Sequence, residues 1–227
     1  MAVAVLAVAA AFAFWWRMPP AVPIVESVRQ LTDDGEPKFE QLATDGSRVY
    51  FTEGTTGSAH LAQVSVTGGR TGFVENHATD AILQGISPDS SSLLAILNVA
   101  SQLEAPAWSI PIPAGEPRQL GEMPVSQATY FPDGRLLLLE GKNIFVADRD
   151  GLNPRQLFAT ENYSLGDFAW NPSISPDGKR IVVTTSSSLT ELAAGRQFPS
   201  PCAGLRHGKR YLEPRWQIRS LRNTEPR

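Results

Sequence analysis

The chain of 227 residues has few of the side chains on which catalysis and covalent cross-linking usually depend. Cys202 is its only cysteine, which excludes an internal disulfide and a thiolate-rich zinc site. The three histidines, His60, His77 and His207, do not have the spacing of a metal-binding motif. The G-x-S-x-G sequence of serine hydrolases is also missing. We therefore predict a non-enzymatic protein without catalytic, cofactor-binding or metal-binding residues.

Positive charge is scarce outside the C-terminal part of the sequence. Residues 196–227 contain eight Lys or Arg and two Asp or Glu, whereas the preceding 195 residues contain twelve basic and twenty-one acidic side chains. Proteins bind nucleic acids mainly through Lys and Arg contacts to phosphates. The acidic main part therefore predicts that this chain itself binds no nucleic acid.

The amino terminus has no charged residue before Arg17, which follows sixteen apolar residues. A membrane-spanning helix needs about 20 apolar residues, and Trp15 and Trp16 stand where the aromatic belt of a bilayer would lie. We predict a transmembrane or signal-anchor helix over residues 1–18, followed by a Pro-rich linker over residues 19–27. A cleaved signal peptide and a buried core helix are the alternatives. The anchor would make this a single-pass membrane protein with its main domain on the extracytoplasmic side.

One short sequence recurs at a constant interval. Asp45, Asp89, Asp133 and Asp177 follow one another at a spacing of 44 residues, each in a turn sequence related to SPDG. Proline presets the second turn position, aspartate bonds back to the backbone, and glycine accepts the left-handed conformation. We assign a structural role to these repeat turns, whose residues are Asp45, Gly46, Pro88, Asp89, Pro132, Asp133, Gly134, Pro176, Asp177 and Gly178.

Short apolar runs precede and follow each turn, and two further runs complete each repeat, the last often reading PRQL. No repeat has room for a substantial helix. Four antiparallel strands in a repeat of about 40–50 residues make one blade of a β-propeller, which is stable only when its faces pack against neighbouring blades. We predict an all-β fold with about four four-stranded blades in an incomplete ring over residues 28–198. The arginine-rich residues 199–227 predict an irregular basic tail.

The repeats resemble the WD40-like repeats of TolB-type propellers. The resemblance depends on SPDGKRIVV at residues 175–183, on FPDGRLLLLEGKNIFVADRDGLNPRQL at residues 131–157, and on the weaker SPDSSSLLAIL and TDGSRVYF. It implies a ring of six or more blades, and RQLT at Arg29–Thr32 then resembles an outer strand that pairs with a last blade. A hydrophobic segment before such repeats resembles bacterial regulators that join a winged-helix domain, a transmembrane helix and an outer propeller. The winged-helix part is not in this sequence.

Two functional classes follow from this resemblance. The first is a non-catalytic, membrane-anchored propeller that serves as a sensing or protein-interaction module, as part of a transmembrane transcriptional regulator or as a periplasmic TolB-like adaptor. The second is the propeller portion of a prolyl-oligopeptidase-like peptidase without its hydrolase domain. We favour the first, with the membrane as a partner through residues 1–18 and a protein or small ligand on the propeller face. A cation or partner site formed by the four turn aspartates is the alternative to their structural role.

Overall fold

The computed structural model describes residues 27–55, 57–75, 80–97, 104–141, 143–158, 170–184, 189–195 and 215–221. The chain divides into two units, Met1–Gln30 and Leu31–Arg227, and every strand belongs to the second. The regular elements of the described residues are all β-strands, which confirms the predicted all-β class. The predicted helix over residues 1–18 lies outside the described residues. Among the residues that are described, no helix has the length and apolar character needed to cross a membrane.

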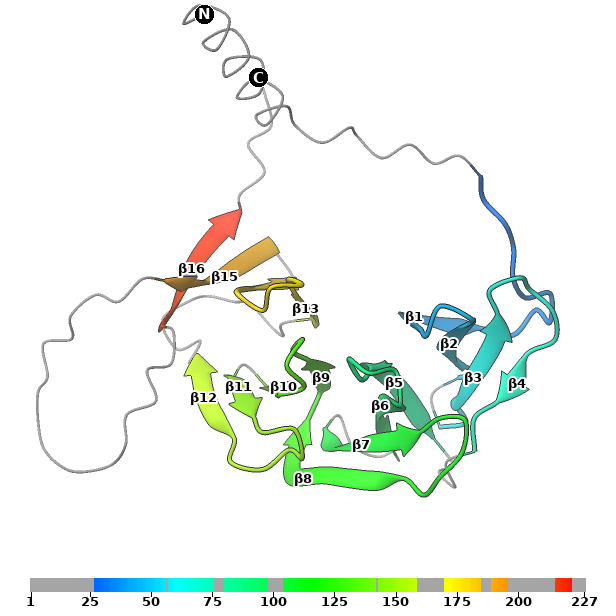
Figure 1. The fold of residues 1–227 in the computed structure, drawn as a ribbon, viewed down its shortest axis with the longest axis horizontal. Helices are drawn as coiled ribbons and strands as arrows, with labels where there is room; N and C mark the ends of the chain where they lie inside the picture. The colour runs from blue at the N-terminus through cyan, green and yellow to red at the C-terminus, as the bar shows by residue number, and fades with distance from the viewer. Residues whose placement is uncertain are drawn as a thin grey trace, which may run out of the picture. The chain divides into compact units, whose positions relative to one another are not determined.

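The strands form four antiparallel sheets, each with four strands paired in chain order (Figure 1). The first sheet contains β1 (Lys38–Thr44), β2 (Arg48–Glu53), β3 (His60–Ser65) and β4 (Gly72–Phe73). The second contains β5 (Ala81–Ile86), β6 (Ser92–Leu97), β7 (Ala105–Pro111) and β8 (Arg118–Val125). The third contains β9 (Gln127–Tyr130), β10 (Leu136–Glu140), β11 (Asn143–Ala147) and β12 (Arg155–Phe158). The fourth contains β13 (Trp170–Ile174), β14 (Arg180–Thr184), β15 (Leu189–Gly195) and β16 (Arg215–Leu221).

The core consists of apolar layers between successive sheets. Buried side chains of the first and second sheets form one cluster, those of the second and third form another, and those of the third and fourth form a third cluster. The second strands of the second and third sheets each contribute to two layers, so that Leu136–Leu139 are all buried without alternation. A strand covered on both faces requires such a continuous apolar run.

The first strands of the sheets are neighbours, because β1 contacts β5, β5 contacts β9, and β9 contacts β13 (Figure 1). Glutamine side chains connect them. The Gln41 Nε2 of β1 donates to the carbonyl of Gln84 at 3.3 Å, and the amide N–H of Ala128 in β9 donates to the Gln84 Oε1 at 3.1 Å. Gln84 is buried, and buried polar groups need partners. This interior polar chain therefore fixes how three successive sheets meet.

The third sheet differs from the second and fourth sheets by one residue in its first hairpin. The backbone pair that closes this hairpin is Ser87 with Ser92 in the second sheet and Ser175 with Arg180 in the fourth, but Phe131 with Arg135 in the third. The shorter loop shifts β10 by one residue relative to the 44-residue period. A one-residue shift moves side chains to the other face of a strand. Leu138 therefore packs toward the preceding sheet, the second. Leu94, which stands 44 residues earlier in the second sheet, packs toward the following sheet, the third, so the two equivalent leucines meet in one cluster.

Two predictions about the outer strands are wrong. We predicted an irregular tail over residues 199–227, but Arg215–Leu221 forms β16 and pairs with β15 along seven residues. An outer strand has a free edge and tolerates polar residues, so its arginines did not prevent pairing. We also expected Arg29–Thr32 to be an outer strand, but these residues form none. Instead, Leu31 packs against the apolar cluster of the first sheet that faces away from the second.

Candidate functional site

The four repeat turns share two backbone features. The residue after each aspartate has a positive φ, which is +88° at Gly46 and Gly134, +68° at Gly178 and +56° at Ser90. Each aspartate accepts a hydrogen bond through its Oδ1 from the backbone N–H two residues later, at 2.8 Å for Asp45 and at 3.1–3.2 Å for Asp89, Asp133 and Asp177. The prolines at positions 88, 132 and 176 occupy the second turn position and are exposed.

The carboxylates of these turns are largely occupied by their own loops. Asp45 accepts from two backbone N–H groups, from the Ser47 hydroxyl and, through its other oxygen, from the Tyr50 hydroxyl at 2.8 Å. These donors, the Arg48 N–H first among them, lower the pKa of Asp45. The hydroxyl of Ser175 and the N–H of Lys179 likewise lower the pKa of Asp177. The described residues contain no group of three His, Cys, Asp or Glu side chains placed to hold a metal ion.

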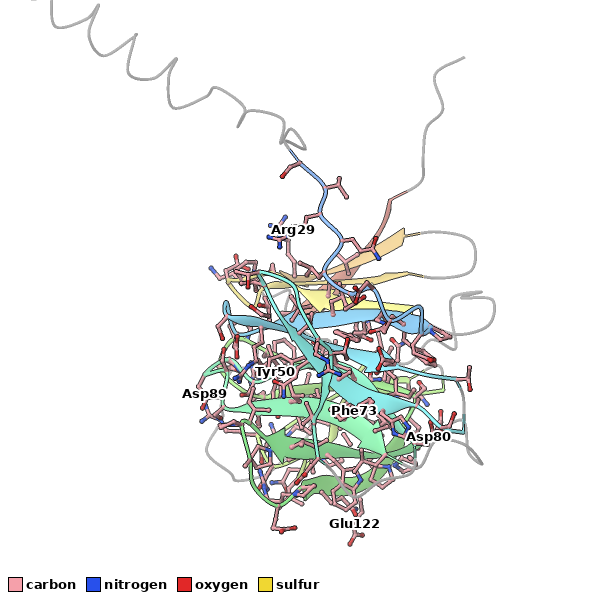
Figure 2. The ribbon with its side chains drawn as sticks, turned by 90° about the vertical axis from the view of Figure 1, so that its right-hand side faces the viewer. Arg29, Tyr50, Phe73, Asp80, Asp89 and Glu122 are labelled. Carbon is pink, nitrogen blue, oxygen red and sulfur yellow. The ribbon has the colours of Figure 1, made fainter. Side chains whose placement is uncertain are left out.

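The second, third and fourth turns lie at the same end of their sheets, which we call the turn end. An added Cβ at Gly178 would lie 3.7 Å from the Cδ of Pro132, so the third and fourth turns touch. Figure 2 shows Asp89 at this end and Asp80 at the other, with β5 between them.

A cleft of about 440 Å³ opens at the turn end between the second and third sheets. This volume lies in the range of small-ligand sites, about 300–1,000 Å³. The second sheet and its turns supply most of the lining and the third sheet supplies the remainder. The lining residues are Ser87, Pro88, Asp89, Ser91, Ser92, Ser109, Pro111, Arg118, Tyr130, Gly134 and Arg149.

Hydroxyl groups organise the side of the cleft that the second sheet forms. The Ser87 hydroxyl donates to the Oδ1 of Asp89 at 2.7 Å and accepts from the N–H groups of Ser91 and Ser92 at 3.1 and 3.0 Å. The hydroxyls of Ser87 and Ser91 and the N–H of Ser91 lower the pKa of Asp89 to about 2. Asp89 is therefore charged at neutral pH. Burial raises the pKa of Tyr130, whose hydroxyl interacts with those of Ser92 and Ser109 and stays neutral.

Two arginines supply positive charge from opposite sheets. Arg149, in the turn between β11 and β12, donates from Nη2 to the carbonyl of Asp133 at 2.8 Å. A Cβ on Gly134 would lie 2.6 Å from the Nε of Arg149, so only glycine lets the guanidinium lie against this turn. Arg118 begins β8, is exposed, and its side chain has no hydrogen-bond or ion-pair partner among the described residues. Its donors are available to a ligand.

A close backbone contact sets the distance between the elements that carry these arginines. A Cβ on Gly121 in β8 would lie 2.3 Å from the carbonyl oxygen of Gly151, and a Cβ on Gly151 would lie 2.4 Å from the carbonyl carbon of Leu120. Gly121 and Gly151 also have φ values of +65° and +80°. The two glycines thus allow β8 and the turn with Arg149 to meet backbone against backbone, beside the cleft.

A smaller cleft of about 120 Å³ lies between the third and fourth sheets. Its lining includes Phe131 and Arg135, which stand 44 residues after Ser87 and Ser91. Phe131 is 1% exposed, and the Arg135 guanidinium lies over its ring at 5.1 Å while pairing with the Asp133 Oδ2 at 2.8 Å. The large side chains fill space that the serines leave open in the preceding cleft.

Sequence reasoning located the turns but missed the cleft. It named Pro88, Asp89 and Gly134, which lie in the lining, but not Arg118, Tyr130 or Arg149. The available signal was a departure from the repeat: small serines at positions 87 and 91, where the next repeat has phenylalanine and arginine.

Comparisons with known proteins identify the fold. No protein-family model matches the sequence, and no curated protein matches it. Among solved structures, TolB from Acinetobacter baumannii is 15% identical with a TM-score of 0.51, and a putative TolB from Agrobacterium tumefaciens is 17% identical with a TM-score of 0.54. A structure of the nidogen/laminin complex is 15% identical with a TM-score of 0.53. The chain has a TolB-type β-propeller fold.

The four sheets are therefore propeller blades, as the repeat predicted. The matches cover 67% of this chain for the Acinetobacter TolB and 66% for the other two proteins. The chain spans 40% of the length of the first and 58% of the length of the others. At this level of identity the likeness concerns the fold alone, because propeller folds carry many functions.

Proposed function

We propose that this propeller is a non-catalytic protein-interaction module that binds its partner at the turn end of its blades. The observation that carries the proposal is the open cleft between the second and third blades, where the Arg118 side chain has no hydrogen-bond or ion-pair partner among the described residues. Binding sites in proteins combine a concave surface with a few convergent polar groups, which this cleft provides. The rigid blades on either side hold those groups in place without a partner.

Site-specific photo-crosslinking in cells that make the protein tests this proposal. A p-benzoylphenylalanine in place of Pro88, at the rim of the cleft, is expected to give a discrete adduct with another protein. The matched control replaces Thr55, which is exposed in the connection between β2 and β3, and is expected to give none. Adducts of equal yield at both positions, or at neither, would overturn the proposal.

A substitution inside the cleft makes the test specific. Ser87→Phe introduces the side chain that occupies the equivalent position of the next blade, and it is expected to fill the cleft. We expect the adduct at position 88 to disappear in this variant. An unchanged adduct would show that the partner binds the rim without using the cleft.

We also propose that residues 1–18 anchor the propeller to a membrane as a single-pass helix, with the blades on the extracytoplasmic side, where a sensing role becomes available. The uncharged apolar run before Arg17 and the neighbouring tryptophans support this proposal. The full chain is expected to stay with membranes after alkaline carbonate extraction and to be cleaved by protease added to spheroplasts. Leu6→Arg is expected to release it, whereas Leu6→Ile is not. Extraction of the unmodified chain by alkaline carbonate would contradict the proposed membrane anchor.

A further inference from the structure

We propose that the cleft between the second and third blades binds a carboxylate of a peptide segment and that Arg118 is the group that receives it. This inference rests on the proposed interaction function and names the chemistry of its ligand. A guanidinium presents two parallel N–H donors that match the two oxygens of a carboxylate. Arg118 is the arginine of the cleft whose donors are not used by the described part of the protein.

The charges of the cleft favour a ligand with one negative charge. Arg118 and Arg149 each carry a positive charge, and Asp89 carries a negative one, so the three side chains sum to a single positive charge. The donors around Asp89 keep it ionised at neutral pH. A phosphate with nearly two negative charges would leave an excess of negative charge beside Asp89. A carboxylate carries one negative charge and therefore neutralises the single positive charge of these three side chains.

The remaining lining suits the backbone of a peptide. The hydroxyls of Ser92, Ser109 and Tyr130 lie together in the cleft. A hydroxyl both donates and accepts hydrogen bonds, so these groups can pair with the N–H and C=O groups on either side of the ligand carboxylate. Pro88 and Pro111 add apolar surface at the rim. A free inorganic anion can accept from these hydroxyls but offers no backbone N–H group to their oxygens.

The position of Arg118 is set by the fold rather than by ligand binding. Arg118 begins β8, which pairs with β7 through Ser109 opposite Arg118 itself. The contact between Gly121 and Gly151 then fixes β8 against the turn that carries Arg149. Because paired strands and this contact hold the backbones before binding, ligand uptake needs to order the arginine side chain but not the backbone that carries it.

Fluorescence polarisation with the full chain in detergent micelles tests the inference. The probes are four N-terminally labelled tetrapeptides: Ala-Ala-Glu-Ala amide, Ala-Ala-Gln-Ala amide, and Ala-Ala-Ala-Ala with a free or an amidated C-terminus. We expect saturable binding of a carboxylate probe and at least about tenfold weaker binding of its amide counterpart, because a charge-assisted hydrogen bond is lost. Comparison of the Glu probe with the free C-terminus shows which of the two carboxylates the cleft prefers.

Variants assign the binding to Arg118. Arg118→Gln is expected to weaken carboxylate binding at least about tenfold, and Arg118→Lys to restore only part of it, since lysine lacks the fork geometry. Arg70→Gln, in the exposed connection between β3 and β4, removes the same charge elsewhere and is expected to change affinity less than twofold. Melting temperatures confirm that all three variants are folded.

Three outcomes would overturn the inference: no probe binds, acid and amide probes bind equally, or Arg118→Gln binds like the unmodified chain. Each of these is independent of the cross-linking result. If the adduct at position 88 forms and depends on the cleft while carboxylate probes fail, the interaction function stands and only the ligand class is wrong.

Discussion

The two clefts at the turn end occupy the same position of the repeat but have different contents. The cleft between the second and third blades measures about 440 Å³, and the next one measures about 120 Å³. Ser87 contributes to the first, whereas Phe131, 44 residues later, is buried at the second. The blades on either side of each cleft have four strands in the same order, although the first hairpin of the third blade is one residue shorter.

This difference shows how a repeat can keep one fold while the space between its blades varies. The turn backbone depends on the aspartate and on the positive φ of the residue after it, and these features recur in every blade. The first turn position accepts either side chain, because the carbonyls of Ser87 and Phe131 both accept from the N–H three residues later, at 2.8 and 2.9 Å, although the N–H of Ser87 pairs with Ser92 and that of Phe131 with Arg135. The side chain at this position can therefore open or fill a cleft while the turn keeps its aspartate and its positive φ.

The largest expected effect on stability comes from removing the aromatic ring that fills the cleft between the third and fourth blades. Phe131→Ser removes a ring that is 1% exposed and the surface over which Arg135 lies. A buried aromatic replaced by a small residue costs about 3–5 kcal/mol of unfolding free energy, measured by urea denaturation. Phe73→Ser is the matched control, because Phe73 is 64% exposed and its loss is expected to cost less than about 1 kcal/mol. Equal costs would show that Phe131 does not stabilise the blade interface.

The backbone contact beside the open cleft gives the next largest effect. Gly121→Ala places a Cβ 2.3 Å from the Gly151 carbonyl oxygen at a φ of +65°, and we expect a loss of about 2–4 kcal/mol. Gly72→Ala is the control, since its Cβ would lie 3.9 Å from the nearest side-chain atom. If the first variant is as stable as the control, the two blades are not held together by this contact.

The architecture was predictable from sequence because it depends on local chemistry and a period. Proline, aspartate and glycine at the turns specify a backbone, and the apolar runs beside them specify strands. The one-residue shift of β10 was not predictable, because the shorter hairpin at Phe131 leaves the 44-residue spacing of the aspartates unchanged. The run of four leucines has no polar and apolar alternation that would show which face of the strand each leucine occupies.

The candidate site was less predictable because it is a property of two blades at once. Arg118 and Arg149 come from different blades and show no pattern in the sequence. Their proximity depends on the contact of Gly121 with Gly151, and the two glycines reveal their role only through the distance between their backbones. An open cleft forms where side-chain packing is missing. In the sequence this is visible only as Ser87, where the next repeat has Phe131.

A smaller effect on stability is expected when the residues that follow the turn aspartates of the two blades are exchanged. Ser90 has a φ of +56°, where Gly134 of the next blade has +88°. A left-handed conformation is costly for residues with a side chain, so Ser90→Gly is expected to stabilise the protein by about 0.5–1 kcal/mol after the entropy cost of glycine. The reciprocal Gly134→Ser is expected to destabilise it, because its Cβ would meet Arg149. Thermal unfolding of both variants measures the pair, and changes of the same sign would contradict this comparison.

The smallest effect is the pH dependence of the turn at the open cleft. Asp89 receives its hydrogen bonds from hydroxyl and amide groups, which lower its pKa in the folded protein to about 2 from 3.8. A carboxyl with a lowered folded pKa stabilises the fold above its unfolded pKa, and this contribution is lost as the pH falls from about 4 toward 2. The difference in melting temperature between the unmodified chain and Asp89→Asn is therefore expected to shrink over this interval. Because Asp45 and Asp177 titrate equally in both proteins, they cancel in the difference, and a difference that stays constant with pH would show that the charge of Asp89 does not stabilise its turn.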